Sequence, residues 1–360
     1  MKQTCGKALT RLQGISWPKL ALALALGGMG GGLAHAIELP LAWMIGAMAA
    51  TITASMMNSP IFVPTGLRSG MLIILGTFLG STFTPDMLNQ VHLWPASLVS
   101  VIVFVIAASG FSYLYYRMVS GMDRITALFS ATPGGLTPMT VLGAACGGVE
   151  QQIALVQGLR VVLVVFFTPV LVYGILDMSP ASQAVLEINP LDPMDSLILI
   201  GGALAGLFVA RALRIPAPQM TGPMLVSAAL HIFGFVENGL PPILLDITLW
   251  VLGSAIGSRF AGMPLRSLTP FILHAFANII LLFAVTYLAS LLVANLLDLE
   301  LLAVLLAFAP GGVAEMCLIA LSLNVDPSFV ALHHLARITL ILVSAPLLGK
   351  MFAGSPERAP

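Results

Sequence analysis

Apolar stretches long enough to cross a membrane recur from one end of this 360-residue chain to the other. A helix of about 17 to 25 mostly apolar residues spans a hydrocarbon core of about 30 Å. Charged residues make up 8% of the chain, against roughly 25% in a soluble domain, so most of the surface must face something other than water. The sequence therefore predicts an all-α, polytopic membrane protein in contact with a lipid bilayer.

Several function classes lack the residues that they need. The formal net charge is zero and no basic stripe is visible, so we expect no binding to nucleic acid. The three cysteines, Cys5, Cys146 and Cys317, have no paired spacing typical of a metal site or a disulfide framework. The sequence contains no nucleotide-binding loop of the Walker type. We therefore expect no metal, no cofactor and no enzyme activity.

The sequence also contains an internal duplication. A block with the spacing P-x-x-x-M-x-G-x-M occurs at 40–48 and again at 216–224, an offset of 216 − 40 = 176 residues. Three further blocks recur at an offset of 177: 75–83 with 252–260, 133–139 with 310–316, and 154–160 with 331–337. Four blocks in nearly constant register indicate two homologous copies of one membrane module.

Each copy predicts the same series of segments. A Gly/Ala-rich helix is followed by a short helix after a proline, a glycine-bearing helix, a long apolar helix, a Pro-Gly-Gly segment and a last helix. The predicted ranges are 18–36, 41–57, 67–84, 94–116, 123–147 and 151–176 in the first copy, and 196–213, 217–233, 243–260, 271–295, 300–324 and 328–349 in the second. The predicted divisions are an N-terminal tail (1–17), membrane repeat 1 (18–177), an acidic linker (178–195), membrane repeat 2 (196–349) and a C-terminal tail (350–360).

Basic residues indicate the orientation, because Lys and Arg concentrate in cytoplasmic loops. They place both tails and the turn with Arg117 and Arg124 in the cytoplasm, and the acidic linker outside. Four helices return the chain to the cytoplasm, so the rest of the first copy must cross an odd number of times. This holds if each Pro-Gly-Gly segment is a broken helix or a re-entrant segment. The two repeats, of about five to six helices each, then form an inverted pair, as in many secondary transporters.

The Pro-Gly-Gly segments are the first candidate site. Proline removes a backbone donor and glycine weakens a helix, and broken backbone survives in lipid only when protein buries it or when it lines a cavity. Breaks at matching positions of two repeats mark the binding site of a transporter. We therefore assign solute binding to both segments, although a packing kink with close helix contact remains an alternative. The residues concerned are Pro133, Gly134 and Gly135 in the first copy, and Pro310, Gly311 and Gly312 in the second.

Two arginines strengthen the assignment. Arg160 and Arg337 occupy the same repeat position in otherwise apolar helices. A buried arginine costs at least about 2.5–3.5 kcal/mol on insertion, so it usually faces a partner or a cavity. We expect both to bind solute, together with Thr137 and Gln157 as neutral hydrogen-bonding residues of the first copy.

Three ionisable residues of the second copy are candidates for proton coupling. Glu315 lies inside the second break, and its distance from the turn near 324–327 resembles that of Arg337, so we expect these two side chains to pair. His333 and His334 precede Arg337 by four and three residues, which places them beside it on a helix. Because histidine changes charge near neutral pH, Glu315 with His333 or His334 could form a proton relay. The alternative is a satisfied buried ion pair without a functional role.

The paired Pro-Gly-Gly blocks, each followed by an arginine, and the P-x-x-x-M-x-G-x-M block resemble the AbrB duplication family of bacterial membrane proteins. The resemblance covers nearly the whole chain and implies a multi-pass protein of the bacterial inner (plasma) membrane. Members carry two labels, ammonia monooxygenase and membrane regulator of gene expression. The two copies differ at one point of the motif, with Gln157-Gly-Leu-Arg160 in the first and His334-Leu-Ala-Arg337 in the second.

Three functions follow from these observations. The first is secondary transport of a small anionic or carboxylate-bearing solute, with proton coupling through Glu315 as an extension. The second is regulation of gene expression through a protein partner or indirectly. The third, a membrane monooxygenase, would need clustered metal ligands, which only Glu315, His333 and His334 approach. The sequence leaves the oligomeric state open, a homo-oligomer included.

Overall fold

The computed structural model of the chain describes residues 16–83, 94–175, 193–236, 238–262, 265–323 and 325–353. Within these ranges the protein is all-helical, with 14 α-helices and one 3₁₀ turn at Ser258–Phe260. The predicted all-α class is therefore confirmed. Most of the predicted N-terminal tail, most of the acidic linker and the end of the C-terminal tail lie outside the described residues.

Helices occur at every predicted segment of the chain. Those in the predicted first copy are α2 (Trp17–Ala36), α3 (Ala42–Met56), α4 (Thr65–Gly80), α5 (Trp94–Met118), α6 (Arg124–Ala131), α7 (Leu136–Ala145) and α8 (Glu150–Ile175). Those of the second copy are α9 (Pro193–Ala212), α10 (Pro218–Ile232), α11 (Pro242–Gly257), α12 (Leu265–Leu297), α13 (Leu301–Phe308), α14 (Val313–Ser322) and α15 (Pro327–Ala353). Each Pro-Gly-Gly segment separates two short helices, so the predicted helix breaks are confirmed.

Six helices in the described part of the chain are long and apolar enough to cross a membrane. Their spans are Trp94–Met118, Glu150–Pro169, Pro193–Ala212, Pro242–Phe260, Thr269–Leu297 and Pro327–Ser344. Shorter apolar helices, among them α7 and α14 at the breaks, add to these spans. The protein is thus a multi-span membrane protein, as expected. The first predicted crossing, α2, has the length of a span but is not among the six.

The helices divide into two compact units by their contacts. The first unit comprises residues 1–75 and 241–263, and the second comprises residues 76–240 and 264–360. Each unit takes residues from both predicted repeats, because the glycine-bearing helix of one copy packs on the proline-initiated helix of the other. The division into repeats 18–177 and 196–349 stays a prediction about the sequence.

The first unit depends on close helix contacts at glycine. In it α3 packs against both α2 and α11. A Cβ on Gly46 would collide with the backbone of Gly30, and a Cβ on Gly253 would collide with the carbonyl of Met44. The indole Nε1 of Trp250 donates a hydrogen bond of 2.9 Å to the carbonyl of Leu24. Glycine therefore allows the backbones of α2, α3 and α11 to come into close contact, as is typical of helix pairs in membranes.

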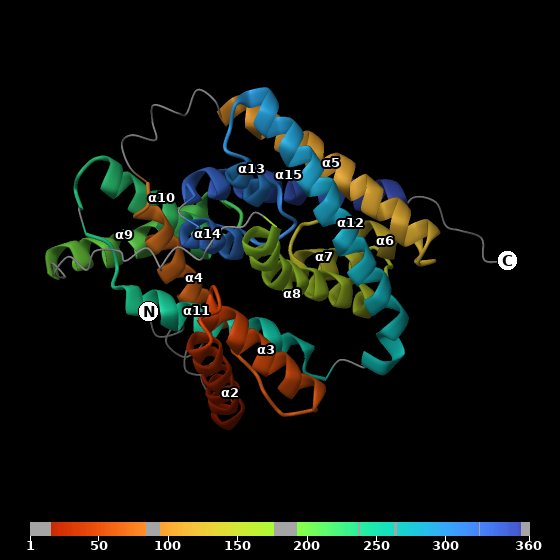
Figure 1. The fold of residues 1–360 in the computed structure, drawn as a ribbon, viewed down its shortest axis with the longest axis horizontal. Coiled ribbons are helices and arrows are strands. Elements are labelled where there is room, and N and C mark those ends of the chain that lie inside the picture. The colour runs from red at the N-terminus through yellow and green to blue at the C-terminus, as the bar shows by residue number, and fades with distance from the viewer. Residues whose placement is uncertain are drawn as a thin grey trace. The chain divides into compact units, whose positions relative to one another are not determined.

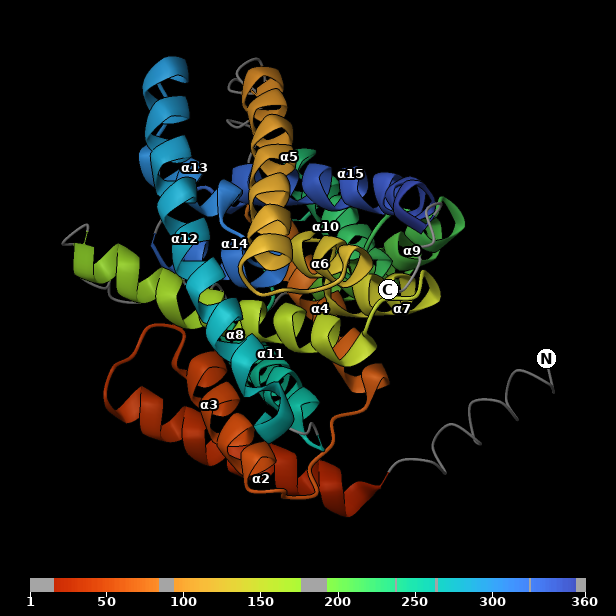
Figure 2. The same cartoon turned by 90° about the vertical axis from the view of Figure 1, so that its right-hand side faces the viewer.

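The second unit repeats the same kind of contact and adds the helices that hold the candidate site. A Cβ on Gly222 of α10 would collide with the backbone of Gly206 of α9, and one on Gly76 would collide with the carbonyl of Met220. Figures 1 and 2 show α5 and α12 side by side in this unit, with the first residues of α5 beside the last residues of α12, so these helices run in opposite directions. The broken pairs α6–α7 and α13–α14 pack beside them with the long helices α8 and α15.

Candidate functional site

The first break turns the chain out of the helix by local backbone geometry. Helix α6 ends at Ala131, and Thr132 has extended angles of φ −74° and ψ 124°. Gly135 then takes φ 88°, a left-handed value that favours glycine, immediately before α7 begins. At the second break Ala309 is likewise extended, at φ −50° and ψ 137°, whereas Gly312 has φ −81° rather than a left-handed value. Each break therefore separates two short helices, α6 from α7 and α13 from α14, as the proline and glycine residues predict.

The middle glycine of each break lies against a long helix of the other copy. A Cβ on Gly134 would come 2.5 Å from Met139 Cε and 2.6 Å from Ile341 Cγ2 of α15. A Cβ on Gly311 would come 2.9 Å from Val164 Cγ1 of α8. Even alanine would therefore overpack either break. These contacts bring the two breaks and the two long helices into one cluster.

In the first copy, Gln157 joins the break to Arg160. Its amide Nε2 donates hydrogen bonds to the carbonyl oxygens of Phe129, at 2.7 Å, and Thr132, at 2.9 Å. Its Oε1 accepts a hydrogen bond of 2.5 Å from the guanidinium of Arg160. Gln157 thus satisfies carbonyls that the end of α6 leaves without helical partners, and Arg160 has no other hydrogen-bond partner among the described residues.

In the second copy, His334 stands where Gln157 stands in the first. Its Nε2 lies 2.9 Å from the carbonyl oxygen of Leu306, so this nitrogen must carry the proton and donate. Its Nδ1 is then an acceptor, and it receives a hydrogen bond of 2.7 Å from Arg337. Arg337 also donates to the carbonyls of Ala309, at 2.6 Å, and Gly311. The hydrogen bonds of His334 therefore fix its neutral tautomer and position Arg337.

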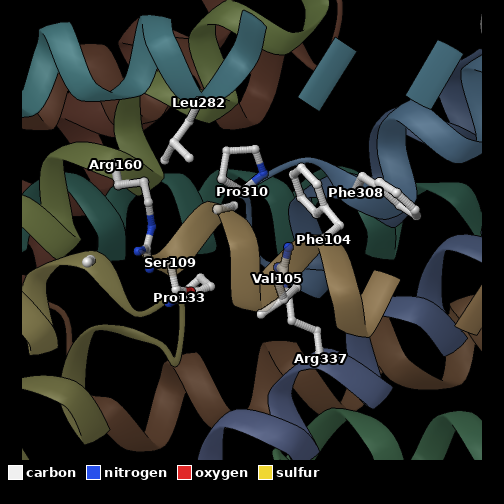
Figure 3. Close-up of a pocket in the computed structure, with 11 residues that line it drawn as sticks. Phe104, Val105, Ser109, Pro133, Arg160, Leu282, Phe308, Pro310 and Arg337 are labelled. Atoms are coloured by element: carbon white, nitrogen blue, oxygen red, sulfur yellow. The ribbon is translucent and has the colours of Figure 1, made fainter. Parts of the chain in front are cut away.

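The proline of each break and both arginines line one narrow pocket in the second unit, whereas the glycines of the breaks are not among the lining residues. Figure 3 shows Arg160 and Arg337 reaching toward Pro133 and Pro310 from opposite sides. The pocket is narrow, with a cavity volume of about 20 Å³, which is room for about one water molecule. The lining residues are Phe104, Val105, Ala108, Ser109, Ala131, Pro133, Arg160, Leu282, Phe308, Pro310 and Arg337.

The positive charge in this pocket is the main electrostatic feature of the site. Arg160 is 6% exposed and Arg337 is 2% exposed, and their charges repel each other. The Nε atom of each is buried without a hydrogen-bond partner. Within the described ranges, neither guanidinium has a carboxylate among its hydrogen-bond partners. Two desolvated cations that lie near each other without a carboxylate partner are costly.

Glu315 lies at the start of α14 rather than opposite Arg337. It is the third residue of that helix, and its carboxylate lies so close to Gly312 that a Cβ there would collide with it. Acidic side chains at this position are stabilised by the free N–H groups and by the dipole of the helix N-terminus. The predicted pairing of Glu315 with Arg337 is not formed among the described residues, where Arg337 bonds instead to Ala309, Gly311 and His334.

His333 is buried between α15 and α5. Its Nδ1 donates to the carbonyl of Phe329 at 2.7 Å, and its Nε2 lies 2.9 Å from the hydroxyl of Ser97. The Ser97 hydroxyl also lies 3.0 Å from the carbonyl of Trp94, so it can donate either to Nε2 or to that carbonyl. A neutral and a charged His333 can both keep two hydrogen bonds. In the described part of the chain, no hydrogen bond links Glu315 to His333.

Some predicted residues lie away from the pocket, and some pocket residues were not predicted. Thr137 is exposed in the first turn of α7 and is not among the lining residues. Ser109 of α5 and Leu282 of α12 line the pocket, but they belong to ordinary apolar helices. The one sequence signal for these two residues is Ser109 itself, a polar residue within an apolar segment. Among the described residues, no group of three or more His, Cys, Asp or Glu side chains is arranged to hold a metal ion.

Comparison with known proteins gives one family and two distant relatives. The profile of a family described as "Transition state regulatory protein AbrB" matches residues 43–353. The chain is 27% identical to YhjN of Bacillus subtilis (strain 168) over 353 residues, which cover 90% of each protein. It is 25% identical over 345 residues to a protein of Escherichia coli (strain K12) named "Putative regulator AbrB", covering 94% of this chain and 97% of that protein.

Proposed function

We propose that this chain, which belongs to the AbrB family, is a secondary transporter of a small anionic or carboxylate-bearing solute. Its helices surround a pocket that contains two buried arginines. The observation that carries the proposal is that Arg160 and Arg337 line one pocket together with Pro133 and Pro310. Neither arginine has a carboxylate partner among the described residues, so a solute anion would supply the missing negative charge.

An inverted repeat is part of the proposal, and matched contacts support it. Gln157 bonds the carbonyl of Phe129, and His334 bonds that of Leu306, at the same separation of 28 residues. Helix α8 packs on α12 as α15 packs on α5, and the equivalent helices α5 and α12 run in opposite directions. Inverted repeats place a solute between matched broken helices and let one half rock against the other.

Proton coupling is the finer part of the same proposal. Glu315 is half-buried beside the second break, where it could change charge as the break moves. His333 can keep its hydrogen bonds in either charge state. His334 was predicted with them, but both of its nitrogens already have partners that require the neutral ring. We therefore propose Glu315 and His333 as the proton-carrying residues, with His334 positioning Arg337.

Flux into proteoliposomes tests the transporter directly. The purified chain would be reconstituted and offered lactate, malonate, phosphate and 2-oxoisovalerate, with glycerol as a neutral comparison, and uptake would be measured by mass spectrometry. We expect saturable uptake of at least one anion, and a loss of at least about tenfold in Arg160→Gln. Gly110→Ala serves as the control, because a Cβ at Gly110 meets no atom within 4 Å. Uptake of every anion at the level of empty liposomes would refute the proposal.

Regulation of gene expression is the second candidate, and it rests on the name of the Escherichia coli relative. We propose that any such role acts through a partner protein or through the solute. Cross-linking in membranes followed by mass spectrometry would support direct regulation if one partner is captured in stoichiometric amount and no anion is transported. Anion transport without a captured partner would refute direct regulation through a partner protein.

A further inference from the structure

The two arginines of the pocket are not equivalent, and their difference indicates the class of anion that fits. We infer that the solute is a small monocarboxylate with a short apolar tail, and that its carboxylate binds Arg160. This inference rests on the proposed function. Arg337 is then a positioning residue that holds the second break in place.

The charge of Arg337 already has local compensation. Its guanidinium donates to the carbonyls of Ala309 and Gly311 and to His334 Nδ1. Ala309 directly follows the last residue of α13, where the free carbonyls of a helix carry a partial negative charge. Three of the five N–H donors that a guanidinium possesses are committed to this structure. A solute would have to break these bonds to bind Arg337 fully.

The charge of Arg160 has no such compensation. In the first copy it is Gln157, not the arginine, that binds the carbonyls of Phe129 and Thr132. Within the described part of the chain, Arg160 therefore keeps one hydrogen-bond partner, the neutral Gln157 oxygen, and its buried Nε has none. The pocket thus has one uncompensated positive charge within reach of a solute. One carboxylate balances it, and its two oxygens match the planar fork of a guanidinium.

The rest of the pocket is apolar and leaves little for a second charge or several hydroxyls to bind. Phe104 and Phe308 stack on each other with ring centroids 5.0 Å apart, and Val105 and Leu282 continue the apolar wall. Apart from the two arginines, Ser109 supplies the polar side chain of the lining. An aliphatic tail would gain free energy by leaving water for this wall, whereas a second carboxylate would be desolvated without a partner. Because the cavity has a volume of about 20 Å³, the pocket must widen to admit even a short tail, which favours solutes of a few carbons.

Ligand-dependent melting of the purified full chain in detergent tests this inference. The probes are acetate, isobutyrate and isovalerate as a series of tail lengths, malonate as a dianion, and isovaleramide as the neutral analogue of isovalerate. A ligand that binds only the folded state raises the melting temperature in proportion to its affinity. We expect affinity to rise roughly fourfold for each added carbon, with malonate and isovaleramide weaker than isovalerate.

Two variants identify the arginine that binds. Arg160→Gln should weaken isovalerate binding by roughly 10- to 100-fold and leave isovaleramide unchanged. Arg160→Lys retains the positive charge but not the planar guanidinium, so its affinity for isovalerate should lie between those of the wild-type protein and Arg160→Gln. It replaces the glutamine variant if that protein fails to fold. Gly110→Ala should bind like the wild-type protein.

The outcomes separate this inference from the proposed function. Tighter binding of malonate than of isovalerate, lost in Arg160→Gln, would refute the apolar monocarboxylate but leave an anion transporter. Equal binding of isovalerate and isovaleramide would refute the role of Arg160. Absence of binding by every carboxylate, together with no anion flux into proteoliposomes, would refute both the inference and the proposed function.

Discussion

Replacement of His334 tests the hydrogen-bond network on which the second break depends. The structure assigns two bonds to this ring, from Nε2 to the Leu306 carbonyl and from Arg337 to Nδ1. Glutamine can make the same two bonds, because Gln157 makes them in the first copy with Phe129 and Arg160. His334→Gln should therefore be nearly neutral, and His334→Leu should not.

The size of the difference follows from the bonds lost. A neutral hydrogen bond contributes about 0.5–1.5 kcal/mol and one to a charged group about 1.5–3 kcal/mol. His334→Leu loses one of each kind and leaves a buried arginine with fewer partners, so we expect its free energy of unfolding to fall by roughly 2–4 kcal/mol. His334→Gln should stay within about 1 kcal/mol of the wild-type protein.

Unfolding by SDS titration in mixed micelles, followed by circular dichroism, measures both variants. An equal loss of stability in His334→Gln and His334→Leu would refute the assigned network, because shape rather than hydrogen bonding would then be decisive. A flux measurement adds a second criterion. Since glutamine cannot carry a proton, His334→Gln should retain pH-driven flux if His334 only positions Arg337, and loss of that flux would make His334 a proton carrier.

Three further substitutions have defined outcomes. Gly134→Ala should lower the free energy of unfolding by about 1–3 kcal/mol through overpacking, and an effect no larger than that of Gly110→Ala would contradict the packing described. Glu315→Gln should abolish pH-driven flux, and unchanged flux in proteoliposomes would remove the proton proposal. The pKa of Glu300 is raised by partial burial and by the charge of Asp326, so its contribution to stability is present at low pH and is lost as pH rises through that pKa. Glu300→Gln should therefore flatten the acid side of a melting-temperature profile, which an unaltered profile would disprove.

The helices and their breaks could be predicted because proline, glycine and apolar length act locally. The Pro-Gly-Gly residues remove helical hydrogen bonds wherever they occur, so Ala131 and Phe308 end their helices as expected. The steric reason for Gly134 was not predictable, because Ile341 lies about 200 residues away in the sequence and the contact depends on tertiary packing. Spacing suggested that His334 lies beside Arg337, and the structure agrees.

The site was predicted less completely than the fold. Similar depth suggested that Glu315 pairs with Arg337, but depth does not specify which way a side chain turns. Glu315 is the third residue of α14, where the dipole of the helix N-terminus favours a carboxylate, and backbone carbonyls accept hydrogen bonds from the arginine. The pocket walls on α5 and α12 were missed because Phe104 and Leu282 look like lipid-facing residues until the helices are placed side by side.

The position of a bound anion tests the central claim most directly. A crystal structure of the protein saturated with 2-oxoisovalerate should place its carboxylate about 3 Å from the guanidinium of Arg160, between Pro133 and Pro310. An anion bound elsewhere in the presence of an empty pocket, or a protein carboxylate paired with Arg160, would contradict the account.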